Sequence, residues 1–312
     1  MPLMSRRENG DPHASHIVEN SPPLGPRVPD RRRERKRNLL ICLGLVALTL
    51  LVWIRVVRNS FINYDDGGYV TQNPNIQAGL TWKTLSWALT SVHMGNWHPL
   101  TWLAHASDYQ LFGQSPAGHH FTSLLLHLLN VVLLYLLLYG ATGLMGRGFL
   151  VAGLFAIHPL NVESVAWVAE RKNLLCTFFL FLALAAYGRY VRKPGPARYL
   201  LVAVLFVFAV ASKPMAITLP CLLFLLDFWP LRRVVMQTEQ LDKRRRKRPR
   251  DLEAHPASPS MPMVPLSRAI LEKLPLLALC AASAAVTIYA QRNGGAAIPS
   301  TELMMSSPSW TQ

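Results

Sequence analysis

The sequence predicts an all-α protein, a polytopic transmembrane helical bundle of about seven spans. The 312-residue chain is 51% hydrophobic and only 16% charged, whereas about a quarter of the residues of a soluble domain are charged. The apolar residues are collected in runs long enough to cross a bilayer as helices. The net charge of +15 lies in blocks between these runs. This pattern favours loops at a membrane surface, so we expect membrane lipids as partners and no nucleic acid.

Residues 1–38 are polar, contain prolines and end in RRRERKR, and we expect a disordered, basic cytoplasmic tail. The first span begins at Leu39 and is an uncleaved signal anchor, because no small-residue cleavage site follows it. Lys213-Pro214 interrupts a later apolar run and would be costly at mid-membrane, so we divide that run into two short spans. The expected spans are about 39–57, 119–139, 149–168, 174–190, 199–211, 215–230 and 269–290.

The basic residues predict which side each loop occupies, because cytoplasmic loops are enriched in Lys and Arg. With the N-terminus in the cytoplasm, the inner segments hold 24 of the 32 basic residues. The resulting layout has a membrane domain over 39–230 with an outer loop at 58–118, a basic cytoplasmic loop at 231–268, and a final span with an outer tail at 269–312.

The outer loop opens with FINYDDGGYV, which places Asp65 and Asp66 just beyond the first span. Adjacent residues do not face the same way, so we expect one acid to point inward and the other to hold the loop. One acid is a candidate general base. If a divalent cation takes part, this pair supplies its expected ligands. Asp-Gly is also an ordinary turn dipeptide, and the turn and the active site both stay open as interpretations.

Further ionisable residues fall at the same predicted membrane face, where such groups are functional candidates. Arg171, Lys172 and Lys213 are expected to bind a lipid phosphate, which suits their charge and donors. For each single residue, a side chain that reaches water at a helix end is the alternative explanation. The remaining candidate residues on this face are His98, His119, His120, His158, Glu163 and Glu170.

Five stretches are long and specific enough for comparison with known families: NYDDGGYVTQNPNI, NWHPLTWLAHASDYQLFG, AGHHFTSLLLHLLN, LFAIHPLNVESVAWVAERKNLL and ASKPMAITLPCLLFLLDFWPL. They resemble the N-terminal membrane region of a bacterial family that carries C-terminal tetratricopeptide repeats. That family is similar to the animal transmembrane-and-tetratricopeptide O-mannosyltransferases, and both resemble the GT-C superfamily of membrane glycosyltransferases. The resemblance covers residues from about 39 to about 293.

The resemblance implies a GT-C-like enzyme of the bacterial inner (plasma) membrane that uses a polyprenyl-phosphate-linked sugar. It implies that Asp65 and Asp66 form the acidic motif of the first outer loop and that the AERK segment, residues 169–172, lies near the donor phosphate. The acceptor would be a hydroxyl, for example on protein Ser or Thr. Since GT-C enzymes have more spans and the repeats are missing, we expect an incomplete member of the family. Two other functions stay open: a non-catalytic anchor or scaffold, and a transporter with a site at its broken spans.

Overall fold

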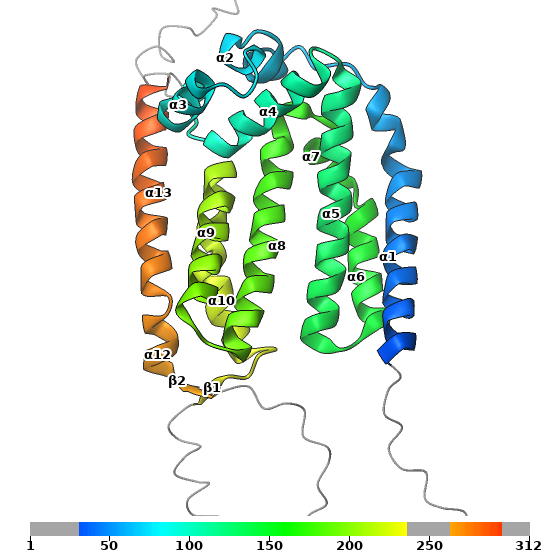
Figure 1. Cartoon of the computed structure of the whole chain (residues 1–312), viewed down its shortest axis with the longest axis vertical. Helices are drawn as coiled ribbons and strands as arrows, with labels where there is room; N and C mark the ends of the chain where they lie inside the picture. Colours follow the sequence, from blue (N-terminus) through cyan, green and yellow to red (C-terminus); the bar gives the residue numbers. More distant parts are fainter. Residues whose placement is uncertain (1–30, 236–262, 295–312) are drawn as a thin grey trace, which may run out of the picture.

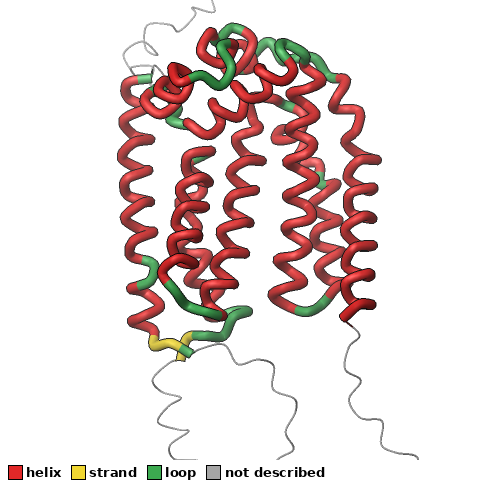
Figure 2. Tube along the Cα trace, in the orientation of Figure 1, coloured by secondary structure: helices red, strands yellow, loops and turns green. Residues whose placement is uncertain are grey.

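The computed structural model describes residues 31–235 and 263–294. Most of this part consists of long helices that run side by side (Figure 1). Figure 2 shows that helices account for nearly all of the described chain. The only strands in this part are β1 (Val234–Val235) and β2 (Val264–Pro265), which pair in parallel. The main helices are α1 (Arg31–Trp53), α5 (Pro116–Thr142), α6 (Met145–Ile157), α8 (Arg171–Arg192), α9 (Pro196–Ser212), α10 (Leu219–Phe228), α12 (Leu266–Leu271) and α13 (Leu274–Asn293).

The expectation of about seven spans was too high. Within residues 31–235 and 263–294, four helical segments are long and apolar enough to cross a membrane: Arg31–Arg58, Pro116–Thr142, Val168–Arg192 and Leu266–Asn293. A fifth is counted if Met145–Ile157 and Pro159–Ala166, bent by 52°, form one span. The two short spans predicted from the run 199–230 are the apolar helices α9 and α10, with 17 and 10 residues. These lengths fall below the roughly 20 residues that a helix needs to cross a bilayer.

The first helix also differs from the expectation, because α1 begins at Arg31 rather than at Leu39. Residues 31–38 were predicted to be disordered. They are helical since Arg, Lys and Glu are good helix formers and continue the apolar helix beyond the bilayer. The Tyr139 hydroxyl of α5 donates to Glu34 at 3.3 Å, which holds this extension against the bundle. The rest of the predicted tail, residues 1–30, and most of the predicted basic loop, residues 236–262, lie outside the described residues.

Short helices form a layer over one end of the bundle (Figure 1). The layer comprises η2 (Gly67–Thr71), α2 (Pro74–Gln77), α3 (Trp82–Thr90), η3 (His93–Gly95) and α4 (Pro99–Phe112). We call this the loop end, and the end that carries β1 and β2 the strand end. Helix α3 covers most of the Trp-containing stretch LTWKTLSWALT. It starts where the Thr81 side chain accepts a hydrogen bond from the Thr84 backbone N–H, as an N-cap residue does.

Two proline-containing breaks interrupt the long helices, and the break at Lys213-Pro214 was predicted. Helix α6 ends at Ile157 before His158-Pro159, and α9 ends at Ser212 before Lys213-Pro214. Proline lacks a backbone N–H and disfavours helical geometry at the preceding residue, so each helix stops there. The breaks place His158, α7 (Val162–Ala166), η5 (Val168–Glu170) and Lys213 beneath the layer of short helices.

Candidate functional site

The acidic turn connects two segments of the loop end through Asp66. The Asp66 side chain is buried, and its carboxylate accepts hydrogen bonds from the backbone N–H of Ile62 at 2.8 Å and of Ala169 at 2.9 Å. Burial raises the pKa of Asp66, and the two N–H donors work against that rise. Asp66 therefore fastens the start of the outer loop to the segment just before the AERK charges.

Asp65 occupies a different environment from its neighbour. It is half-buried, and within the described part of the chain no hydrogen bond or ion pair engages its carboxylate. Its backbone carbonyl accepts from the Tyr69 N–H at 2.9 Å, which fixes the turn. Asp66 is thus the acid that both faces inward and holds the loop, and the role of Asp65 as a base stays a prediction.

Arg171 is the most completely engaged cation of the loop end. Its guanidinium is fully buried and forms an ion pair through Nη1 with Asp108 of α4. Nη2 donates to the His119 carbonyl at 2.6 Å, and Nε donates to Ser123 Oγ at 3.2 Å. All three nitrogens have protein partners, so Arg171 joins α8 to α4 and α5. Its predicted contact with a donor phosphate stays a prediction, and Asp108 was not predicted at all.

Lys172 and Lys213 share one carboxylate, that of Glu170. Lys172 Nζ lies 2.5 Å and Lys213 Nζ 3.5 Å from the Glu170 oxygens. Asn173 bridges the group, since its Nδ2 donates to Glu170 at 2.8 Å and its Oδ1 accepts from Lys213 at 2.5 Å. The Lys213 side chain is 25% exposed, against 9% for Lys172. The cluster carries one net positive charge, and Lys213 is its accessible cation.

Two aromatic side chains, Tyr69 and Trp102, pack next to this lysine cluster, and we call them the Tyr69 floor. Lys172 Nζ lies 4.9 Å from the centre of the Tyr69 ring and 3.4 Å from its hydroxyl. Tyr69 stacks against Trp102, with ring centres 4.6 Å apart. Tyr69 and Trp102 are both buried, and burial raises the pKa of the Tyr69 hydroxyl. The floor keeps the Lys172 ammonium in place through a cation–π contact.

The predicted histidines fall into different settings. His98 is buried, and burial with nearby Lys172 and Lys213 lowers its pKa to about 3, so the imidazole is neutral at pH 7. His119 contacts Asp108 at 3.7 Å and the Gly113 carbonyl at 3.1 Å. His120 is buried beside them on α5.

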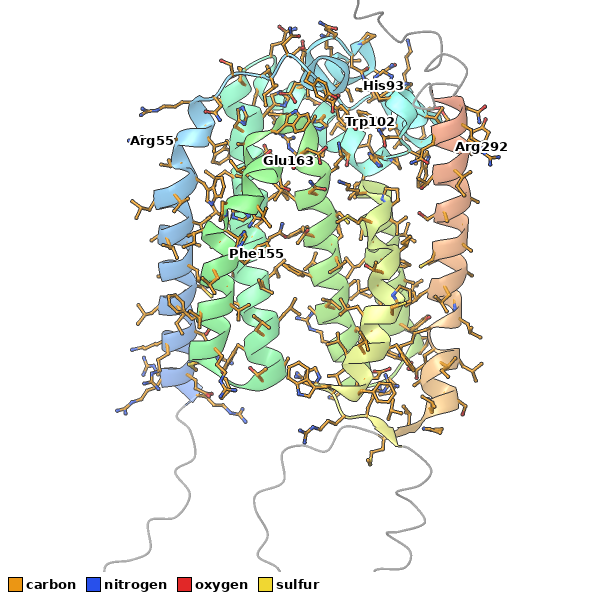
Figure 3. All side chains as sticks on the ribbon, turned by 180° about the vertical axis from the view of Figure 1, so that it is seen from behind. Arg55, His93, Trp102, Phe155, Glu163 and Arg292 are labelled. Atoms are coloured by element: carbon orange, nitrogen blue, oxygen red, sulfur yellow. The ribbon has the colours of Figure 1, made fainter. Side chains whose placement is uncertain are left out.

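His158 and Glu163 lie apart from the lysines. His158 is exposed, and its Nδ1 accepts from the Leu160 N–H at 3.2 Å, so it caps the turn at the break after α6. Glu163 is exposed on α7 (Figure 3). It lines an open hollow of about 470 Å³. The hollow is lined by Asn59, Ser60, Ile62, Val162, Glu163, Ala166 and Trp167. Asp66 accepts from the N–H of Ile62, which lines one side of the hollow. It also accepts from the N–H of Ala169, two residues after Trp167 on the other side.

A metal site built on the acidic pair does not fit this geometry. Both Asp66 oxygens already accept backbone N–H groups, which leaves Asp65 as the free carboxylate. Within residues 31–235 and 263–294, no group of three or more His, Cys, Asp or Glu side chains is placed to hold a metal ion.

Sequence reasoning missed four residues of the site: Tyr69, His105, Asp108 and Asn173. His105 is fully buried in α4, and its ring lies 5.9 Å from Tyr69. Burial, with Arg171 nearby, lowers its pKa well below the ordinary value. The signal that could have pointed to Asp108 is a single acid in the mostly apolar stretch LTWLAHASDYQLF. Its partner Arg171 is 63 positions away in the chain, so only the fold reveals the pair.

Curated animal proteins share a distant similarity with this chain. It is 29% identical over 191 residues to Protein O-mannosyl-transferase Tmtc1 of Drosophila melanogaster, a match that covers 58% of this chain and 22% of that protein. It is 28% identical over 211 residues to Protein O-mannosyl-transferase Tmtc2 of Drosophila melanogaster (62% and 22%). It is 30% identical over 176 residues to Protein O-mannosyl-transferase TMTC1 of Homo sapiens (53% and 20%).

The chain therefore spans about a fifth of the length of these curated relatives. No family model matches it. No solved structure matches it either. The expected similarity to the animal O-mannosyltransferases is confirmed as distant homology over about half of the chain, and the chain is a multi-pass membrane protein.

Proposed function

We propose that this chain is the membrane part of a GT-C-type glycosyltransferase that moves a sugar from a polyprenyl-phosphate donor to an acceptor hydroxyl. The homology to proteins named O-mannosyl-transferases supports mannose as the sugar and protein Ser or Thr as the acceptor. The proposal rests on a carboxylate and a cation that both lie at the loop end. A free carboxylate, Asp65, and an accessible cation, Lys213, both lie near the Tyr69 floor.

In the proposed reaction the acceptor oxygen bonds to the anomeric carbon of the sugar while the bond from that carbon to the donor phosphate oxygen breaks. Asp65 takes the proton of the acceptor hydroxyl, a role in which a placed carboxylate contributes about 10²–10⁴-fold to the rate. The polyprenyl phosphate leaves as an anion. Lys213 offsets the negative charge of this phosphate. Lys172, which lies over the Tyr69 ring, adds a second positive charge.

Arg171 and Glu170 act through other residues in this proposal. Arg171 holds the start of α8, which carries Lys172, against α4. Thr101 of α4 donates to the Ser212 carbonyl at 2.9 Å, and this bond fixes the end of α9 just before Lys213. Glu170 then sets the direction of both ammonium groups. The arrangement places the cations before substrate arrives, which is what electrostatic stabilisation of a leaving group requires.

The hollow beside α7 is the proposed entrance for the acceptor. Its lining combines the Trp167 ring and the Glu163 carboxylate with small polar groups. Asp65 directly precedes Asp66, which fastens Ile62 of this lining. An acceptor in the hollow would thus approach the acidic turn from the side of α7.

The proposed setting is a bacterial plasma membrane with the N-terminus in the cytoplasm and the loop end outside. The distribution of basic residues supports this orientation. A polyprenyl donor keeps its tail in the bilayer and its sugar at the surface. A base and cations at one end of the helices suit that geometry.

Sugar transfer from lipid-linked donors by the full-length protein tests the proposal. Lys213→Ala should raise the donor KM about tenfold or more, because a hydrogen bond to a charged group is worth about 1.5–3 kcal/mol. Lys83→Ala is the matched control, since Lys83 is an exposed cation on α3 of the same layer. Equal donor KM values for the two variants would contradict the phosphate role. A wild-type protein that binds donor but transfers no sugar would favour the scaffold function instead.

A further inference from the structure

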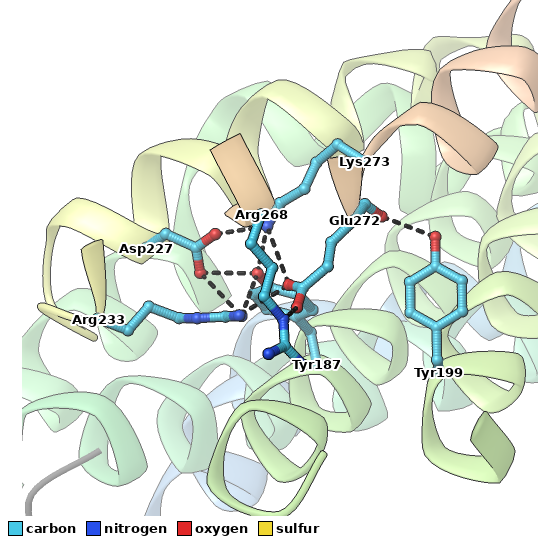
Figure 4. Close-up of polar contacts among 7 residues, drawn as sticks. All are labelled: Tyr187, Tyr199, Asp227, Arg233, Arg268, Glu272 and Lys273. Carbon is cyan, nitrogen blue, oxygen red and sulfur yellow. Dashed lines mark hydrogen bonds and ion pairs between the residues drawn. The ribbon is translucent and has the colours of Figure 1, made fainter. Parts of the chain in front are cut away.

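A second group of buried charges lies at the strand end, where α10 ends and α13 begins. Figure 4 shows the polar contacts of this group. Its centre is Asp227 at the end of α10. One Asp227 oxygen accepts from the Tyr187 hydroxyl at 2.6 Å and lies 3.5 Å from Arg233. The other oxygen pairs with Lys273 at the start of α13. Arg233 also binds Glu272 at 2.7 Å. We call these five residues the strand-end network.

The strand-end network is buried and balanced in charge. Asp227, Arg233 and Lys273 are 0%, 1% and 3% exposed. Two carboxylates face two cations, and the Tyr187 hydroxyl also accepts from Lys273 at 2.6 Å and from Arg233 at 3.0 Å. Loss of one charge would leave its partner buried without compensation, which is far more costly than loss of an exposed pair. The network therefore fixes the start of α13 against α8 and α10.

Helix α13 has few other contacts that define its position. Its buried residues are Leu276, Ser283 and Ala290, which lie seven positions apart and form one narrow stripe. Apolar burial gives little drive for helices to associate in lipid, because lipid tails are as apolar as the side chains. A narrow apolar stripe of this kind allows α13 to slide along its neighbouring helices and to tilt against them. The polar contacts of Lys273 and Glu272 are what specify the register of α13.

The other end of α13 reaches the candidate site. Gly294 packs so closely on η3 that a Cβ atom there would lie 2.4 Å from Gly95 Cα. Figure 3 shows Arg292, near this end, at the same end of the bundle as His93. His93 Nε2 lies 3.1 Å from the Gly68 carbonyl, within the turn that follows Asp65-Asp66. The His93 ring also contacts Trp102 at 5.6 Å.

We propose that the strand-end network is a latch that sets the register of α13, so that the far end of α13 holds η3 over the candidate site. Its members are positioning residues and do not touch substrate. The last step of this inference, the effect on catalysis, rests on the proposed function. The effect on the position of α13 does not.

Distances between spin labels test the latch without any activity assay. Spin-labelled unnatural amino acids at Thr90 and Arg292, which are both exposed, report the separation of α3 from the end of α13 by double electron–electron resonance in nanodiscs. Asp227→Asn or Lys273→Met should broaden or shift this distance distribution. The double variant should return toward the wild-type distribution, because it leaves the neutral Arg233–Glu272 pair.

Controls keep this test decisive. Tyr187→Phe removes only one hydroxyl and serves if a charge variant fails to insert; it should also broaden the distribution. Arg268→Ala should leave it unchanged, since the Arg268 side chain is 61% exposed and its one ion pair among the described residues is with Glu272, at 3.6 Å. In the transfer assay we expect the single variants to lose about tenfold to a hundredfold in kcat, as small misplacements do, with partial rescue in the double variant.

Wild-type distances in all three single variants would overturn the latch. The latch would also be overturned if the distance distribution of the double variant were disturbed as much as the sum of the two single variants. If the wild-type protein transfers no sugar while the distances respond as expected, the proposed function fails and the latch stands.

Discussion

Replacing Asp108 with Asn tests whether the Arg171 ion pair holds the loop end together. Asn keeps the shape of the side chain and removes its charge. The two side chains are 4% and 0% exposed, so the Arg171 guanidinium would stay buried without a counter-charge. Asp108 also accepts from Thr122 Oγ1 at 2.9 Å, a bond that Asn can keep through its own oxygen. The change therefore acts on the Arg171 ion pair and on the weaker 3.7 Å contact of Asp108 with His119.

The expected loss is about 3–5 kcal/mol of the free energy of unfolding, the usual result of removing one partner of a buried pair. Lys83→Ala on the exposed surface should cost less than about 0.5 kcal/mol. The double variant Asp108→Leu/Arg171→Met removes both charges and keeps similar volumes. We expect it to be more stable than Asp108→Asn alone, because no charge remains buried.

Unfolding in mixed detergent micelles, followed by circular dichroism and by protease resistance of the loop end, measures these differences. The reasoning fails if Asp108→Asn unfolds at the wild-type detergent fraction. It also fails if the double variant is less stable than Asp108→Asn, because the guanidinium would then be stabilised by something other than Asp108.

Three further outcomes follow from the loop end. Asp66→Asn should cost about 1.5–3 kcal/mol of stability, since an amide can accept only one of the two N–H bonds that the carboxylate accepts; wild-type thermal stability would contradict this. The pKa of His98 is about 3 in the folded protein and 6.5 in the unfolded chain. Between these pH values the unfolded chain therefore binds one proton more than the folded protein. Stability should fall as pH drops from about 6.5 toward 3, and His98→Gln should flatten that slope in urea titrations at several pH values. Trp167→Ala should raise the KM for a Ser/Thr-containing acceptor peptide about tenfold or more and leave the donor KM unchanged; the reverse pattern would place the donor in the hollow.

The sequence was informative where local chemistry decides the structure. The proline at 214 ended a helix where it was expected to, because a missing N–H acts on its own segment. The count of spans was less accurate, since hydropathy identifies an apolar run but not whether each half of a broken run is long enough to cross the bilayer.

The sequence offered candidate site residues but not the pairs that they form. That Asp65 and Asp66 would differ followed from their adjacency, but the choice of Asp66 as the buried one depends on Ala169, 103 positions away. The pairing of Arg171 with Asp108 was missed because the two residues are 63 positions apart in the chain. The strand-end network likewise joins four separate segments, and charge in the sequence does not say which charges meet.

The turnover of full-length Asp65→Asn tests the central claim most directly. Sugar transfer to an acceptor peptide is measured at saturating lipid-linked donor, with Asn63→Ala, a change at an exposed neighbour, as the control. If Asp65 is the base, kcat falls about 10²–10⁴-fold, while donor binding and thermal stability match the wild-type protein. Wild-type kcat in Asp65→Asn would show that the acidic turn is only a turn, and would contradict the account.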